Sequence, residues 1–241
     1  WPKGSGTADA PIKIDKYGGD ALPVINGMGI DRGMNYSGAV HLRNQEYWEI
    51  RNLEVTNDDD FDVDIDLSRP QGDNSWSSQA ETRNGILIIA DGDLLNDDDD
   101  GIFDHIYIEN CYVHDVDGPN DWNDTFTGGI IYNVVGTKIR PNTSFRDIRI
   151  AYNTIRKVDL LGITGFVQMA KSGYQDDVDT YNLWMEDIYI GHNYIEDVAQ
   201  GGIDLCDARN AVVEYNVVDG FLKRYPNFRP TVALYPWKCE N

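Results

Sequence analysis

The feature of the sequence that most restricts its fold is a short pattern that recurs five times. In each copy an apolar residue is followed five positions later by another apolar residue, and an asparagine lies between them at the third or fourth place. The copies are residues 50–55, 108–113, 150–155, 190–195 and 213–218. Self-similarity of this kind is typical of chains that stack like units on one another.

The asparagines of the pattern predict a tight bend in each copy. They are Asn52, Asn110, Asn153, Asn193 and Asn216. Asparagine tolerates the left-handed backbone of a tight bend and can hydrogen-bond to its own main chain there. We therefore expect two short strands in each copy, separated by a bend.

Each copy is preceded by an apolar run that begins with a glycine. These runs start at Gly38, Gly85, Gly129, Gly162 and Gly202. The alternation of apolar and polar residues has period two and no amphipathic helix pattern is present, which argues for an all-β chain. The order of glycine strand, second strand, bend and third strand predicts a parallel β-helix of about six to seven coils, with a rise of ~4.8 Å per coil.

Composition excludes several classes of protein. The chain has 241 residues, with 41 Asp and Glu against 20 Lys and Arg, a formal net charge of −21. A nucleic-acid-binding protein needs a basic surface, and an anionic membrane would repel this one, so neither partner is expected. The longest apolar run, residues 86–90, is far too short to insert into a membrane.

The three cysteines argue against a disulfide framework and against a zinc site. Cys111, Cys206 and Cys239 lie far apart and show no CxxC spacing. We expect small buried residues with at most one bridge, so the redox compartment does not follow from them.

Residues 4–18, 44–55 and 212–220 resemble secreted bacterial right-handed parallel β-helix proteins of the pectate-lyase-like superfamily. That superfamily includes polysaccharide lyases and glycoside hydrolases, so the resemblance implies an extracellular or cell-surface protein that takes a polysaccharide or oligosaccharide. Residues 1–241 are expected to form a single β-helix domain. Because residues 11–14 and 234–241 read as parts of incomplete coils, the chain is expected to be a piece of a longer protein, with flanking domains or self-assembly covering both ends.

Loop insertions are expected to flank the glycine strands. They fall at residues 57–84, 115–127 and 221–229 on one side and at residues 91–104, 134–143 and 166–184 on the other. Loops carried by a rigid scaffold are where binding residues concentrate. We therefore expect the face formed by the glycine strands to be the floor of a groove.

Strand alternation predicts a candidate site on that face. Because Ile203 and Leu205 point inward, Asp204 and Cys206 point outward, and Asp207 follows at the turn. Alignment of Asn241 with Asn210 places Tyr235 beside Asp204, and Trp237 and Lys238 beside Cys206 and Asp207. The expected catalytic residues are Asp204, Asp207 and Lys238, and the expected substrate-binding residues are His41, Arg43, Thr164, Phe166, Tyr235 and Trp237. The alternative is a solvated face on which Asp204 and Asp207 pair with Arg209 or Lys238, and on which His41 is a hydrogen-bonded surface residue.

An Asp-rich loop predicts a calcium site. Its candidate ligands are Asn96, Asp98, Asp100, the carbonyl of Ile102 and Asp104. Oxygen ligands at alternate positions before a glycine are typical of the first half of an EF-hand loop, but Tyr107 occupies the place of its last glutamate. A second acidic run, residues 58–66, has no glycine and is weaker. The alternative is that both runs only solvate loop tips.

These observations favour a glycoside hydrolase that cleaves a plant or algal polysaccharide by carboxylate acid/base catalysis. Two alternatives stay open. One is a calcium-dependent polysaccharide lyase acting on a uronate glycan, with Lys171, Arg209 or Lys238 as base. The other is a non-catalytic glycan-binding or structural solenoid of the adhesin type.

Overall fold

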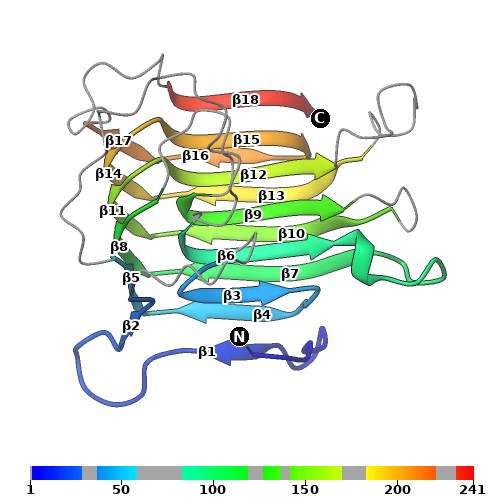
Figure 1. Cartoon of the computed structure of the whole chain (residues 1–241), viewed down its shortest axis with the longest axis horizontal. Coiled ribbons are helices and arrows are strands. Elements are labelled where there is room, and N and C mark those ends of the chain that lie inside the picture. The colour runs from blue at the N-terminus through cyan, green and yellow to red at the C-terminus, as the bar shows by residue number, and fades with distance from the viewer. Residues whose placement is uncertain are drawn as a thin grey trace.

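The computed structural model describes residues 2–28, 37–58, 83–118, 127–136, 142–169, 183–220 and 232–241. Over these residues the chain consists of short strands that run round a common axis, with one 3-10 turn, η3 (Gly92–Leu94). The strands stack with β1 at one end and β18 at the other (Figure 1). No helix in these ranges is long and apolar enough to cross a membrane.

Each circuit contributes one strand to each of three faces. The first-strand face comprises β3 (Val40–Arg43), β6 (Asn84–Asp91), β9 (Gly128–Gly136), β12 (Leu161–Met169), β15 (Gly201–Arg209) and β18 (Val232–Glu240). The second-strand face comprises β1 (Ile12–Ile14), β4 (Trp48–Arg51), β7 (Ile102–Glu109), β10 (Ser144–Ala151), β13 (Met185–Gly191) and β16 (Val212–Glu214). The third-strand face comprises β2 (Val24–Asn26), β5 (Glu54–Asn57), β8 (Tyr112–Val116), β11 (Thr154–Val158), β14 (Tyr194–Val198) and β17 (Val217–Asp219).

The pairing of these strands confirms the parallel β-helix. The third-strand face is a six-stranded sheet of its own, and the other two faces join in a 12-stranded sheet where β13 pairs with β15. The strand pairings given for these three faces are all parallel. The number of coils agrees with the expected six to seven. Complete circuits run from β3–β5 to β15–β17, β1 and β2 precede them, and β18 follows.

Like residues of successive coils lie above one another in the interior. Ile50, Ile108, Ile150 and Ile190 are register partners on β4, β7, β10 and β13, and none is more than 1% exposed. Burial of such a column removes apolar surface from water at every coil, which stabilises the stack. The superposition predicted from the repeat is therefore confirmed.

The asparagines of the repeat form two columns, where the sequence suggested one. At the third place, Asn52, Asn110, Tyr152, His192 and Tyr215 all have positive φ, from 51° to 59°. This is the left-handed bend, and only two of its residues are asparagines. His192 stacks on both neighbouring tyrosines, with ring centroids 4.7 and 4.9 Å apart.

The fourth place is a buried hydrogen-bonded column. Asn193 Nδ2 donates to the Ile150 carbonyl and to Asn216 Oδ1, and Asn193 Oδ1 accepts from the main-chain N–H of Asn153. Leu53 and Cys111 occupy the same place in earlier coils. The role of these asparagines is therefore to satisfy buried main-chain groups, which differs from the bend that the sequence suggested.

Several sequence predictions lie wholly or largely outside the described residues. In this class are the insertion at 221–229, most of those at 57–84, 115–127 and 166–184, and half of that at 134–143, and with them Lys171, most of the second acidic run and most of the expected groove walls. The three cysteines are free. Cys111 and Cys206 are buried as expected, whereas Cys239 is exposed, because it lies on the last described strand.

Candidate functional site

Strand register brings together most of the residues that were predicted to form the site. The first outward column of the first-strand face runs His41, Leu87, Ile131, Thr164, Asp204 and Tyr235, each opposite the next on a neighbouring strand. In the second column Cys206 lies opposite Trp237. The predicted alignment of β15 with β18 is confirmed.

An aromatic pair lies beside Asp204. The rings of Phe166 and Trp237 are nearly parallel, 7° apart, with centroids 5.6 Å apart. Trp237 is 46% exposed and Tyr235 is 44% exposed. Flat aromatic surfaces that remain open to solvent can stack on the apolar face of a sugar ring, because both are large rigid apolar surfaces.

Asn133 supports this pair and was missed in the sequence. It is fully buried, and its Oδ1 accepts a hydrogen bond of 3.0 Å from the main-chain N–H of Phe166. An asparagine inside the apolar run 130–135 was the signal that could have identified it.

Asp204 is the candidate with the most perturbed carboxyl group. Its Oδ1 is buried and has no hydrogen-bond partner within the described ranges. Burial raises the pKa of Asp204 to about 7, because the charged form loses its hydration. Thr164 lies opposite, is 1% exposed, and its Oγ1 likewise has no partner among the described residues.

Asp207 and Lys238 form an ion pair on the same face. Lys238 Nζ lies 2.8 Å from Asp207 Oδ1 and donates to the Leu183 carbonyl at 3.3 Å, and the Val167 main-chain N–H donates to Asp207 Oδ2 at 3.1 Å. Burial raises the pKa of Asp207, and the bond from Lys238 opposes that shift. Of the two pairings expected for a solvated face, the one with Lys238 is confirmed. The one with Arg209 is wrong, because Arg209 binds Glu240 and approaches Glu186.

His41 and Arg43 lie at the other end of the face. Four strand spacings of ~4.8 Å separate His41 from Asp204, a distance of about 19 Å. The expectation of a surface histidine is wrong, because His41 is only 5% exposed. Burial, followed by the charge of Arg43, lowers the pKa of His41 to about 4. Arg43 binds Asp91. The structure therefore does not bring these two residues to the Asp204 cluster.

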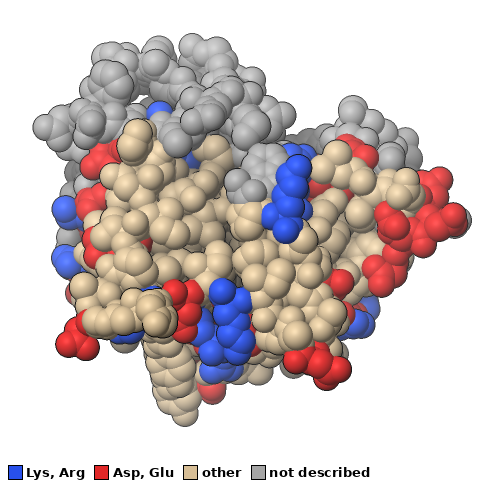
Figure 2. All heavy atoms as spheres, turned by 90° about the horizontal axis from the view of Figure 1, so that it is seen from below, with Lys and Arg blue, Asp and Glu red and all other residues tan. Residues whose placement is uncertain are grey.

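The Asp-rich loop is described in full, and its side chains make local bonds. Asp99 Oδ2 accepts from the main-chain N–H of Asn96, and Asp100 Oδ1 accepts from that of Ile102. Asp104 pairs with Arg146. No group of three His, Cys, Asp or Glu side chains placed to share a metal ion occurs within the described part of the chain. Acidic atoms gather at the right edge of Figure 2, the side to which this loop protrudes in Figure 1.

The calcium site therefore stays a prediction from sequence. The carboxylate of Asp104 is bound by a guanidinium, so this arrangement does not present the expected ligand set.

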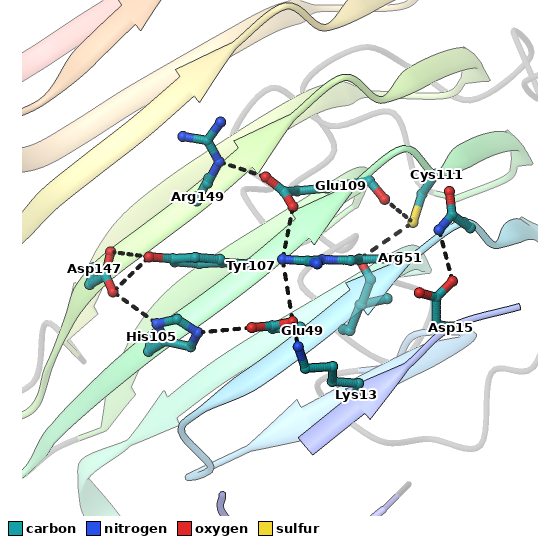
Figure 3. Close-up of polar contacts among 12 residues, drawn as sticks. Lys13, Asp15, Glu49, Arg51, His105, Tyr107, Glu109, Cys111, Asp147 and Arg149 are labelled. Carbon is teal, nitrogen blue, oxygen red and sulfur yellow. Dashed lines mark hydrogen bonds and ion pairs between the residues drawn. The ribbon is translucent and has the colours of Figure 1, made fainter. Parts of the chain in front are cut away.

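A second polar network covers the second-strand face. Glu49 binds Lys13, Arg51 and His105, and Glu109 binds Arg51 and Arg149 (Figure 3). Tyr107 and His105 both contact Asp147. Acids and bases alternate here and bind one another, which is the pattern of a stabilising surface ladder. The first-strand face differs from this network, because Asp204 Oδ1 has no hydrogen-bond partner among the described residues.

Comparisons with known proteins find similarity to lacto-N-biosidases. No family model matches the chain. A lacto-N-biosidase from Bifidobacterium longum subsp. longum is 25% identical over 295 residues, which cover 98% of this chain and 18% of that protein. Two crystal structures of a GH136 lacto-N-biosidase from Eubacterium ramulus match at TM-scores of 0.73 and 0.71, with 24% and 22% identity. Each covers 98% of this chain and 41% of that chain.

The solved structures share the fold of this chain over almost its whole length. The chain spans less than half of the solved relative and about a fifth of the curated one. No pectate lyase is among the relatives named here, so the pectate-lyase-like assignment stays a prediction, whereas the parallel β-helix is confirmed.

Proposed function

We propose that the chain carries the active site of a glycoside hydrolase, with Asp204 as the proton donor. The observation that carries this proposal is the half-buried carboxyl of Asp204: its Oδ1 is buried without a hydrogen-bond partner among the described residues, and its pKa is raised to about 7. Glycoside hydrolysis requires a carboxylic acid that is still protonated near neutral pH, and a buried carboxyl meets that requirement. The likeness to lacto-N-biosidases supports the same class of reaction.

In the proposed reaction, Asp204 donates its proton to the oxygen that joins two sugars. The bond between that oxygen and the anomeric carbon breaks, and water supplies the hydroxyl group that replaces it. A second carboxylate must stabilise the positive charge of the sugar ring or activate the water. Asp207 is our candidate, three residues along β15, and its bond to Lys238 holds it in place. Lys238 is therefore a positioning residue in this scheme.

The remaining predicted residues of the cluster would bind the sugar. Trp237 and Tyr235 offer exposed rings, and Phe166 supports Trp237 from β12. Thr164 Oγ1 offers a hydrogen bond to a sugar hydroxyl, because no described residue uses it. His41 and Arg43 lie too far away to contact the same sugar and would serve only a longer glycan.

The relatives favour a glycan with a lacto-N-biose unit over the plant or algal polysaccharide expected from sequence. Two of the three candidate bases of the lyase alternative are bound to carboxylates, Lys238 to Asp207 and Arg209 to Glu240, and the third, Lys171, lies outside the described residues. Calcium and an extracellular location stay predictions from sequence, and the proposed reaction uses neither.

The test is to incubate the chain with an oligosaccharide that contains a lacto-N-biose unit and, separately, with plant and algal polysaccharides. We expect new reducing ends from the first and no ultraviolet absorbance from unsaturated uronates. Asp204→Asn should abolish the signal, whereas Asp219→Asn, an exposed aspartate on β17, should keep it. Equal activity of wild type and Asp204→Asn would overturn the proposal.

The exposed rings of Trp237 and Tyr235 favour a second candidate, a glycan-binding solenoid without catalysis. Binding of the same oligosaccharide with no release of reducing ends would select it. Substitution of Trp237 by alanine should then weaken binding, and Asp204→Asn should have little effect on it.

A further inference from the structure

The carboxyl group of Asp204 lies over a glycine of its own strand. A Cβ atom at Gly201 would lie 2.6 Å from Asp204 Oδ1 and 3.1 Å from its Cγ. Real side chains do not approach so closely, so the carboxyl occupies space that only a glycine leaves open. The side chain of Asp204 therefore bends back along β15.

Leu161 borders the same space. Its Cδ2 atom would lie 3.0 Å from a Cβ atom at Gly201. Leu161 and Gly201 are register partners on β12 and β15. Leu161 is 2% exposed. It belongs to an apolar cluster that is separate from the interior core and comprises Leu87, Ile89, Ile131, Val135, Leu160 and Leu161. An apolar wall therefore lies on one side of the carboxyl.

A similar arrangement occurs two coils earlier, on β9. Gly128 lies in the same column, since Leu161 pairs with both Gly128 and Gly201. A Cβ atom at Gly128 would lie 2.5 Å from Cδ1 of Ile131, three residues later, as Asp204 is three residues after Gly201. β9 and β15 thus share one local geometry, in which an apolar side chain lies over the glycine at β9 and an acid at β15. Asn84, Leu161 and Val232 occupy this column on β6, β12 and β18, so the arrangement belongs to these two coils.

We propose that Gly201 and Leu161 are positioning residues for Asp204: Gly201 leaves the space in which its carboxyl lies, and Leu161 keeps water from it. For its catalytic consequence this inference rests on the proposed function. The pair holds the carboxyl in a site where the charged form is poorly hydrated, so that about half of the Asp204 carboxyls still hold a proton at pH 7.

The other groups that face Asp204 do not provide this effect. Tyr235 lies opposite on β18, and Thr164, opposite on β12, carries no charge. Cys206 and Asp207 follow on β15, and the charge of Asp207 is offset by Lys238. Loss of hydration is accordingly the cause of the raised pKa of Asp204.

The test is a titration that does not depend on activity. In the full chain with 13C-labelled aspartate carboxyls, the Asp204 resonance is assigned by its absence in Asp204→Asn. We expect it to titrate near pH 7, as its environment implies. Leu161→Ala and Gly201→Ala should each lower that pKa by about one unit, the first by admitting water and the second by displacing the carboxyl outward.

Leu87→Ala is the matched control. Leu87 is as buried as Leu161 and lies in the same apolar cluster, but on β6, three strands away from β15. Both leucine variants should lose similar stability, about 2–5 kcal/mol. Only Leu161→Ala should lower the pKa of Asp204.

The inference is overturned if folded Leu161→Ala titrates like wild type, or if Leu87→Ala shifts Asp204 as much. Should the alanine variants not fold, Leu161→Val takes their place and should lower the pKa of Asp204 by a smaller amount. If that pKa is unchanged in Leu161→Val, the inference is overturned. If the chain cleaves the glycan but the pKa of Asp204 does not respond to Leu161→Ala, the proposed function stands and this inference is wrong. If the titrations are as expected but the chain cleaves no glycan, this inference stands and the proposed function is wrong.

Discussion

Thr164 on β12 lies directly opposite Asp204 on β15, and each has a buried side-chain oxygen without a hydrogen-bond partner among the described residues. Buried polar atoms are almost always paired in folded proteins, by protein, water or ligand. The asparagine column of the same chain follows that rule closely. Because these two adjacent oxygens on one face are exceptions, we expect a hydroxyl group of a bound ligand to hydrogen-bond to them.

Thr164→Val removes the hydroxyl and keeps the shape of the side chain. We expect KM for the glycan to rise about 3- to 10-fold, the equivalent of one lost hydrogen bond, with a smaller change in kcat. The melting temperature should not fall, because no described protein group loses a partner. A lower melting temperature with an unchanged KM would instead assign the hydroxyl to the fold.

Asp204→Asn should change how stability depends on pH. The folded-state pKa of Asp204 is about 7 and its ordinary value is 3.8. Between these values the folded chain holds a proton that the unfolded chain lacks, so the free energy of unfolding falls as pH rises from about 4 to 7. The loss is at most about 4 kcal/mol. Urea denaturation at pH 4.5 and pH 7.5 should show a smaller loss in Asp204→Asn than in wild type.

The ion pair of Asp207 and Lys238 predicts how stability changes when one partner or both are replaced. Asp207 is 2% exposed, so Lys238→Met leaves a buried carboxylate without its cation and should cost about 3–5 kcal/mol. The double variant with Asp207→Asn should recover much of that loss, since no charge is then buried. Denaturation of wild type, both single variants and the double variant measures the coupling. Simple addition of the two single effects would show that the pair contributes nothing.

The asparagine column predicts an unequal response to the same substitution in two coils. Asn193→Ala removes side-chain hydrogen bonds to Ile150, Asn153 and Asn216, and the Ile150 carbonyl and the Asn153 main-chain N–H lose a buried partner. We expect a loss of about 2–4 kcal/mol. Cys111 occupies the same column with only weak sulfur contacts, so Cys111→Ala should cost about 1 kcal/mol. Chemical denaturation of the two variants tests the difference, and equal losses would contradict it.

The repeat contained enough information to predict the fold and part of the site. Period-two alternation and a constant order of strands allow few solutions other than a stacked coil, and the alignment of Asp204 with Tyr235 followed from that stacking. The bend and the buried column were confused because asparagine suits both, and it is the structure that separates them: Asn110 is exposed with positive φ, whereas Asn153 is buried and hydrogen-bonded.

What the sequence could not show was solvent access. His41 alternates outward, as predicted, yet it is buried, because burial of an outward residue depends on what covers the face and not on strand period. The space at Gly201 was hidden for a related reason. A glycine three residues before an acid does not predict a contact between them, and only the structure shows that the Asp204 side chain bends back over Gly201.

The last prediction concerns the interior beneath the site. Tyr132 on β9 is fully buried, its hydroxyl has no hydrogen-bond partner in the described part of the chain, and its ring fills the space under Gly165. An unpaired buried hydroxyl costs free energy, so Tyr132→Phe should stabilise the chain by about 1 kcal/mol. Gly165→Ala is the contrasting change, since a Cβ atom there would lie 2.1 Å from the ring, and it should destabilise strongly. Thermal melts of both variants provide the measurement. A Tyr132→Phe variant that melts below wild type would show that the hydroxyl is paired after all, with a water molecule inside the coil.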